Sequence, residues 1–243
     1  NRARNANPFF HLYEALWMLA GRNDIDPLTY YNSRMKEYSD DGETFNGAYG
    51  YRWRHYPDSK EYTELKEAGL GSEIDQLKIL IAHLRVKPES RRAVLQMWNV
   101  EDDLLKIDTS KDVACNTSIY FSVELGRCPA CEGKGYIKPD SSWREGDRVF
   151  SCHSCNGEPH DNPRYLNMTV CNRSNDLIWG MLGANVVHFS ILQEYMAAHL
   201  GLKVGVYNQF TNNLHAYTER WEPEKWLAEI ERGQPEYEND WQF

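Results

Sequence analysis

Runs of apolar and polar residues along the chain predict a mixture of helices and strands. Asn7 and Pro8 begin a predicted helix over residues 8–19, because asparagine caps helices well and proline fits the first helical position. This helix is apolar on nearly every side, so we expect it to be buried, with Glu14 as the exception. A buried carboxylate is costly unless it is paired or functional. A salt bridge to a buried arginine is therefore the structural alternative to a functional role for Glu14.

The rest of the pattern predicts three more helices, four strands and a loop. Apolar residues at helical spacing place helices over residues 76–87, 186–200 and 221–232. Alternation of apolar and polar residues places strands over residues 93–99, 117–124, 166–172 and 204–210. Residues 39–50 are rich in Asp and Gly, which indicates a loop.

The composition is typical of a globular protein that does not wrap nucleic acid by charge. The chain has 243 residues and a mass of 28.4 kDa, and its 27 basic and 36 acidic residues give a net charge of −9. A duplex-DNA binder would need a basic face. Apolar residues make up 41% of the chain, and no apolar run approaches the roughly 18–20 residues of a membrane span. No signal peptide is visible, and because the chain starts at Asn1 we expect its natural N-terminus to be missing.

Four of the six cysteines form a metal-binding pattern, Cys128-x2-Cys131-x20-Cys152-x2-Cys155. Two such pairs supply four thiolates that can surround a structural zinc ion tetrahedrally. We therefore expect a small zinc-binding module over residues 126–164, inserted at a hairpin tip into a main domain of residues 1–125 and 165–243. Sparse cysteines with this spacing predict a reducing, cytoplasmic location, the host cytoplasm if a phage encodes the chain.

Several local patterns, taken in chain order, resemble the thymidylate synthase superfamily, which includes the deoxycytidylate and deoxyuridylate hydroxymethylases of bacteriophages. The resemblance covers about residues 7–124 and 166–221 and rests on Glu14 in Tyr-Glu-Ala-Leu-Trp, Gly47-Ala-Tyr49-Gly50, Asp75-Gln-Leu, Pro88-Glu-Ser-Arg91-Arg92, Ala-Cys115-Asn116, Arg173-Ser174-Asn-Asp176, Asn185 and His215-Ala-Tyr217. It implies an α+β fold, a mixed sheet packed with helices, and a homodimer that forms through the sheet.

The resemblance implies a chemistry for four residues. Cys115 is the nucleophile, whose thiolate adds to pyrimidine C6 and turns C5 into a carbon that attacks a one-carbon donor, 5,10-methylenetetrahydrofolate. Glu14 organises water and proton transfers at the base. Tyr49 lies near the C5 proton, and Asn116 beside the nucleophile is expected to order a water with Glu14.

Other positions match substrate contacts of the family. Arg91, Arg92, Arg173 and Ser174 match the phosphate site of a pyrimidine nucleoside monophosphate, with the first two reaching across a dimer interface into the partner's site. The remaining matches are Asp176 for the folate pterin, Asn185 for the base, and His215 and Tyr217 for the sugar 3′-hydroxyl. Asn185 favours uracil, but its amide also suits cytosine, so the base stays open. His188, one helical turn later, is interpreted as an ordinary helix-face histidine.

Three departures from the synthase pattern bear on the product. Asn116 replaces the usual histidine after the nucleophile, Met35 aligns with a tryptophan that favours hydride delivery, and the tail at residues 241–243 differs. More water at the site favours a 5-hydroxymethyl product over a methyl one. Thymidylate synthase proper is the alternative. A zinc-ribbon binding protein is a further alternative, although the mixed charges around its cysteines argue against nucleic-acid binding.

Overall fold

The computed structural model describes residues 7–56, 74–125, 134, 136–137, 150–152, 164–218 and 228. Within these ranges the elements are, in order, α1 (Pro8–Leu19), α2 (Asp26–Tyr31), η2 (Ser33–Tyr38), α3 (Tyr49–Arg54), α5 (Gln76–Val86), β1 (Val94–Gln96), η4 (Val100–Leu104), β2 (Asn116–Leu125), β3 (Tyr136–Ile137), β4 (Phe150–Ser151), β5 (Arg164–Asp176), η6 (Leu177–Met181), α6 (Ala184–Leu200) and β6 (Lys203–His215).

The main sheet has four strands in the order β1-β2-β5-β6. Strand β2 runs antiparallel to both β1 and β5, whereas β6 runs parallel to β5, its partner across helix α6. Along one face, Leu95 lies opposite Ile119, and Ile119 lies opposite Val170, so apolar residues of three strands form one continuous buried row. The mixed sheet with helices confirms the predicted α+β class.

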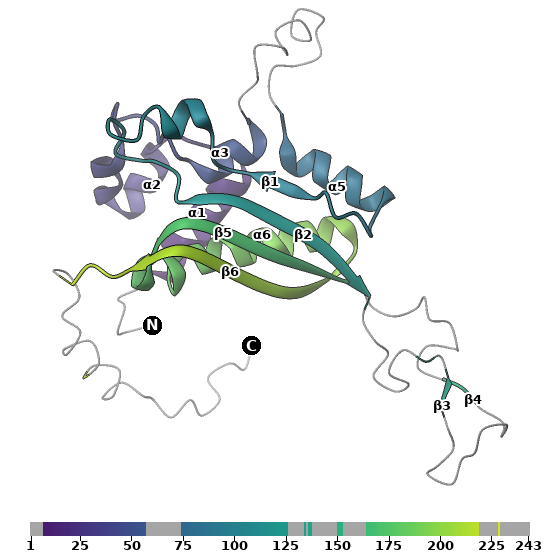
Figure 1. The fold of residues 1–243 in the computed structure, drawn as a ribbon. Coiled ribbons are helices and arrows are strands. Elements are labelled where there is room, and N and C mark those ends of the chain that lie inside the picture. The colour runs from purple at the N-terminus through teal and green to yellow at the C-terminus, as the bar shows by residue number, and fades with distance from the viewer. Residues whose placement is uncertain are drawn as a thin grey trace, which may run out of the picture.

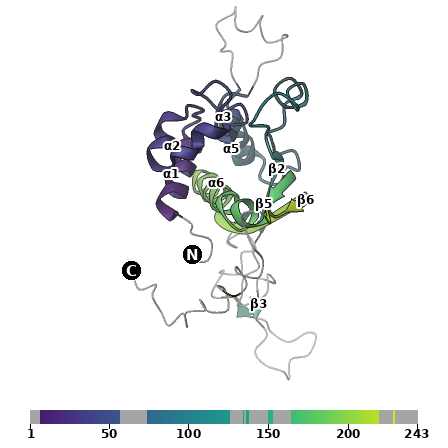
Figure 2. The same ribbon diagram turned by 90° about the vertical axis from the view of Figure 1, so that its left-hand side faces the viewer.

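Helices α1, α5 and α6 lie on one side of the sheet (Figure 1 and Figure 2). Helix α6 contributes Phe189, Leu192 and Met196 to the core, where they meet the inward residues of β2 and β5. Helix α1 packs against α6 and α3 and adds Trp17 and Met18 to the same core. The core therefore holds α1 and α6 side by side over the sheet.

The predicted helix ends lie within two residues of the observed ones, because local signals set them: α1 agrees at both ends, α5 ends at Val86 instead of residue 87, and α6 begins at Ala184 instead of residue 186. The Asn7 side chain accepts a hydrogen bond from the Phe10 amide at 3.1 Å, and Asp75 caps α5 by accepting from the Lys78 amide at 2.9 Å. Helix α6 ends at Gly201, whose φ of 68° is a left-handed conformation that glycine adopts without strain.

Helix α1 differs from the prediction in its burial. Phe9, Leu12 and Leu16 are exposed, although the all-round apolar sequence predicted a buried helix. The reason is geometric, because α1 packs against α6, α3 and α2 with the face that carries Phe10, Trp17 and Met18. The prediction of complete burial was wrong for four of the twelve residues of this helix, Pro8, Phe9, Leu12 and Leu16.

Strands β5 and β6 continue beyond their predicted ends at residues 172 and 210. Strand β5 runs through Asp176 and β6 through His215, and these two residues are paired in the parallel register. The residues of both extensions are mostly polar, so alternation of apolar and polar residues did not predict them. The extension places four of the predicted site residues on strands.

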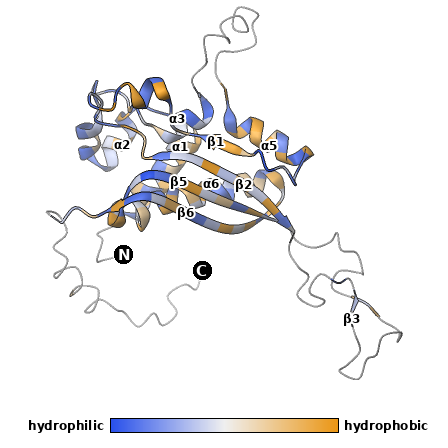
Figure 3. Cartoon of the chain, viewed as in Figure 1, coloured by the Kyte–Doolittle hydropathy of each residue, from blue (hydrophilic) through white to orange (hydrophobic). Residues whose placement is uncertain are grey.

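Hydrophobic and hydrophilic residues alternate along the strands of the main sheet (Figure 3), and some apolar residues lie on its outward face, away from the helices. Val94 lies opposite Tyr120, and Cys171 opposite Phe210, and both Tyr120 and Phe210 are largely exposed. The helices labelled in Figure 2 all lie on the other side of the sheet. An exposed apolar face of this kind is typical of a surface that a partner covers.

Several predictions lie outside the described residues. These are the late helix at residues 221–232, apart from Ala228, and the zinc ligands Cys128, Cys131 and Cys155. Cys152 is described and is buried, and β3 pairs with β4 antiparallel through Tyr136 and Ser151. Among the described helices, none combines the length and the apolarity needed to cross a membrane.

Candidate active site

Cys115 lies immediately before β2, where the chain enters the sheet. Its carbonyl oxygen accepts a hydrogen bond from the Arg173 amide of β5 at 2.9 Å, so the sheet fixes the backbone at this point. Its thiol is half-buried and points toward the Arg173 side chain. The topology thus brings together two residues that are 58 positions apart in the sequence.

The Arg173 guanidinium contacts three consecutive residues of the segment that carries the thiol. Its Nε donates to the Ala114 carbonyl and its Nη2 to the Val113 carbonyl, both at 2.9 Å, and Nη2 also lies 3.7 Å from the Cys115 Sγ. Burial raises the pKa of the Cys115 thiol, and the positive charge of Arg173 opposes that rise. Arg173 is therefore placed to stabilise a thiolate at this position.

Tyr49 and Asn116 contact each other directly after Cys115 in the fold. The Asn116 amide donates to the Tyr49 hydroxyl at 3.3 Å, and burial raises the pKa of Tyr49, which keeps the phenol protonated. The Asn116 side chain is fully buried and donates from Nδ2 to the Cys171 carbonyl at 2.8 Å, while its Oδ1 has no hydrogen-bond partner among the described residues. The side-chain nitrogen of Asn116 is thus hydrogen-bonded to the neighbouring strand β5.

Glu14 pairs with a histidine rather than with an arginine. Its Oε2 lies 3.0 Å from Nε2 of His188, which α6 presents to α1, and His188 is only 5% exposed. The predicted alternative, a salt bridge from Glu14 to a buried arginine, is wrong, because the Glu14 carboxylate lies against His188. The buried Arg52 pairs with Asp103. His188 is likewise no ordinary helix-face residue. The available signal was a lone polar residue between Val187 and Phe189.

A second group of predicted residues gathers where β5 and β6 end. Ser174 Oγ lies 3.4 Å from His215 Nδ1, and the His215 ring meets the Tyr217 ring edge-on at 5.1 Å. Asp176 begins η6 by accepting from the Ile178 amide at 3.0 Å, and its second oxygen is buried without a hydrogen bond to any residue that the structure describes. These side chains converge because β5 and β6 are parallel neighbours.

Asn185 and the two arginines before β1 occupy different surroundings. Asn185 Nδ2 donates to Asn175 Oδ1 at 3.0 Å, and Asn175 is itself buried. Arg91 and Arg92 are exposed, and neither side chain forms a hydrogen bond or an ion pair with another described residue. Within one described chain, therefore, the arginine pair does not join Arg173.

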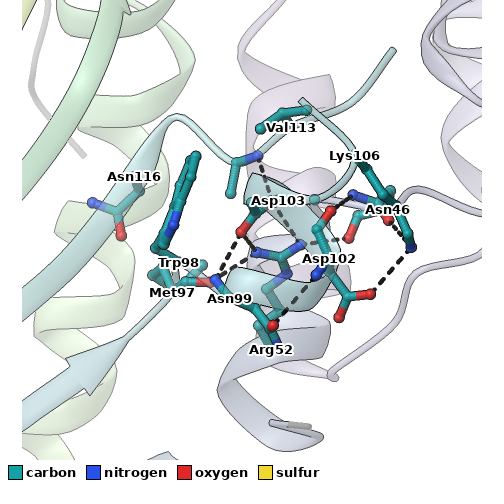
Figure 4. A network of polar contacts seen from close by, with 12 residues as sticks. Asn46, Arg52, Met97, Trp98, Asn99, Asp102, Asp103, Lys106, Val113 and Asn116 are labelled. Atoms are coloured by element: carbon teal, nitrogen blue, oxygen red, sulfur yellow. Dashed lines mark hydrogen bonds and ion pairs between the residues drawn. The ribbon is translucent and has the colours of Figure 1, made fainter. Parts of the chain in front are cut away.

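No local sequence pattern predicted a buried ion pair that supports the segment before Cys115 (Figure 4). Arg52 of α3 and Asp103 of η4 form a bidentate ion pair, and their side chains are only 3% and 0% exposed. Asp103 Oδ1 also accepts from the Ala114 amide at 3.2 Å, and Oδ2 from the Asn99 amide at 2.8 Å. The pair thus holds the residue that directly precedes Cys115.

The sequence pattern of the thymidylate synthase family matches residues 4–239, nearly the whole chain. The chain belongs to the thymidylate synthase family. Its fold agrees with that assignment, since a thermostable thymidylate synthase A from Bacillus subtilis aligns with a TM-score of 0.58 at 20% identity, covering 90% of this chain and 61% of that one.

Curated relatives include enzymes with two different names. The deoxyuridylate hydroxymethyltransferases of Pseudomonas phage M6 and Bacillus phage SP01 are 41% and 34% identical over 89% of this chain. A thymidylate synthase from Symbiobacterium thermophilum is 27% identical over 84% of it. This thymidylate synthase family member spans about half the length of the two phage relatives, 46% and 45% respectively.

Proposed function

We propose that the protein transfers a one-carbon unit from 5,10-methylenetetrahydrofolate to C5 of deoxyuridine monophosphate and releases a 5-hydroxymethyl product. The observation that carries the proposal is the Cys115 thiol held against Arg173 in a chain of this family. The names of the two phage relatives support both the nucleotide and the hydroxymethyl group. Methyl transfer, as named for the Symbiobacterium relative, is the weaker alternative.

In this proposal the reaction begins at the thiolate. Cys115 adds to C6, which makes C5 a carbon nucleophile toward the methylene group of the folate. Tyr49 stays a neutral phenol beside Asn116 and is proposed to relay the C5 proton, which leaves on the folate nitrogen when the bond between that nitrogen and the methylene carbon breaks. Arg173 stabilises the Cys115 thiolate before it attacks C6 and again when the C6–S bond breaks and the product leaves.

The second half of the reaction decides the product. Once tetrahydrofolate has left, the methylene carbon on C5 accepts either hydride or water. Water addition forms a C–O bond, moves the methylene π electrons into the ring, and ends when the C6–S bond breaks and returns its electrons to Cys115. One water proton is lost to a base, for which Glu14 is proposed, and no oxidation takes place.

Uracil suits the amide orientation at Asn185. Because Nδ2 donates to Asn175 Oδ1, the Asn185 Oδ1 is left as an acceptor, and uracil N3–H is a donor whereas cytosine N3 is an acceptor. Ser174, His215 and Tyr217 are proposed to hold phosphate and sugar, and Asp176 the pterin. The four-cysteine zinc module stays a prediction of the sequence.

We also infer a homodimer that forms through the outward face of the sheet. Tyr120 and Phe210 expose apolar surface there, and Arg91 and Arg92 extend from the segment that leads into β1 without partners in the described part of their own chain. An isologous contact of two such faces would bury the apolar residues and send each arginine pair to the partner's phosphate site.

Incubation of the protein with methylenetetrahydrofolate and deoxyuridine monophosphate is expected to give a nucleotide with an added hydroxymethyl group and free tetrahydrofolate. Mass spectrometry of the nucleotide and absorbance of the folate measure the two products. Deoxycytidine monophosphate serves as the matched substrate and is expected to react far more slowly. A methylated nucleotide together with dihydrofolate absorbance would contradict the proposal.

Co-expression of two inactive variants tests the shared site. Cys115→Ser and the double variant Arg91→Ala/Arg92→Ala are each expected to be inactive, because one lacks the nucleophile and the other the phosphate contacts. Random pairing should restore about a quarter of wild-type activity, since one site of each heterodimer is then intact. Activity measured on the separately purified variants is the control, and no recovery on co-expression would rule out arginines supplied by the partner.

A further inference from the structure

Three titratable side chains meet where α1 crosses α6, outside the contacts of the nucleophile. One nitrogen or oxygen from each of His11, Glu14 and His188 lies within 4.8 Å of the other two. The His11 and His188 rings meet edge-on with centroids 6.1 Å apart, and Glu14 Oε2 lies 3.0 Å from His188 Nε2. Such a cluster between two otherwise apolar helix faces is costly to bury, which favours a function.

His188 has a buried polar atom that no residue in the described ranges satisfies. Its Nε2 lies 3.0 Å from Glu14 Oε2 but forms no aligned hydrogen bond with any residue of those ranges. An unsatisfied buried polar atom costs about 1–3 kcal/mol, so a small polar molecule is its natural partner. A water molecule that accepts from Nε2–H and donates to the carboxylate would satisfy both groups.

The cluster faces the side of α6 that the proposed base contact uses. His188 follows Asn185 by three residues, so both lie on one helix face. The next residue, Phe189, stacks on the Tyr49 ring at 5.9 Å, and the Tyr49 hydroxyl accepts from the amide that follows Cys115. Packing thus connects the cluster to Tyr49 and to the residue that follows Cys115, and the helix face connects it to Asn185.

We propose that His188 and Glu14 bind the water that attacks the C5 methylene group, with His188 as the positioning residue. This inference rests on the proposed hydroxymethyl transfer and adds the group that directs the water. His188 donates from Nε2–H to the water oxygen, Glu14 accepts one water proton, and the free lone pair of the oxygen forms the new C–O bond. The proton stays on Glu14 until product release, so that charge and atoms balance.

His188→Phe and His188→Gln separate this role from a structural one. Phenylalanine keeps a ring in the core but has no donor, and kcat for the hydroxymethyl product should fall about 100-fold while the nucleotide Kd stays unchanged. Glutamine keeps an N–H donor and should recover part of that loss. With His188→Phe, a covalent adduct of Cys115, nucleotide and methylene should accumulate and be visible by intact-protein mass spectrometry.

His199→Phe is the matched control, because His199 lies on the same helix but is exposed near the end of that helix. The kcat of His199→Phe should equal that of the wild type.

A wild-type protein that yields no hydroxymethyl product refutes the proposed function, independently of His188. Equal kcat in His188→Phe and wild type overturns the inference, as does an equal loss in both His188 variants without adduct. Stoichiometric divalent metal in the wild type that His188→Phe lacks would also overturn it in favour of a metal site.

Discussion

Cys115→Ser is expected to abolish turnover, with a loss of at least about 10³-fold in kcat, while the nucleotide still binds. A serine hydroxyl has a far higher pKa than a thiol, and Arg173 at 3.7 Å from the sulfur cannot ionise it at neutral pH. Turnover and nucleotide Kd, measured on the same preparation, check both parts of the prediction.

Cys171→Ser is the matched control for that experiment. Cys171 lies on the next strand, and its backbone carbonyl, which accepts from Asn116 Nδ2, is kept by the substitution. Its side chain lies on the outward face of the sheet opposite Phe210, so activity should stay near the wild-type value. Near-wild-type activity in Cys115→Ser would show that the thiolate mechanism does not operate here.

Asp103→Ala is expected to lower the free energy of unfolding by about 3–5 kcal/mol, because it leaves the Arg52 charge buried without its partner. The same substitution removes the acceptor of the Ala114 amide, so the segment before Cys115 loses a fixed point and kcat should fall as well. Urea unfolding measures the first effect, and turnover under conditions where the variant is folded measures the second.

The neighbouring residue provides the control. Asp102 pairs with Lys106 at 3.1 Å on the surface, where both side chains are more than a third exposed, so Asp102→Ala should change the free energy of unfolding by about 1 kcal/mol or less. Two variants one residue apart then differ mainly in burial of the ion pair. Equal destabilisation by both would show that the Arg52–Asp103 pair does not hold this segment.

Local chemistry in the sequence was sufficient for the ends of several helices and for the family, but it predicted neither the short helices α2 and α3 nor the ends of β5 and β6. Asn7, Asp75 and Gly201 each act on backbone groups within a few residues, so their effect on the helix ends could be predicted without the fold. The order of motifs around Cys115 and Arg173 led to the thymidylate synthase family for a similar reason, since each motif is contiguous. The site residues drawn from those motifs keep their roles as proposals.

Partner choice across the fold was decided only by tertiary structure. Whether Glu14 meets an arginine or a histidine depends on which residue α6 turns toward α1, and spacing within α1 carries no information about α6. The Arg52–Asp103 pair joins residues 51 positions apart, so no local pattern could predict it. Pairings of this kind are set by how helices and strands pack. A single sequence therefore predicted Cys115 as the nucleophile by its motif, whereas the residues that surround and support Cys115 were found only in the three-dimensional structure.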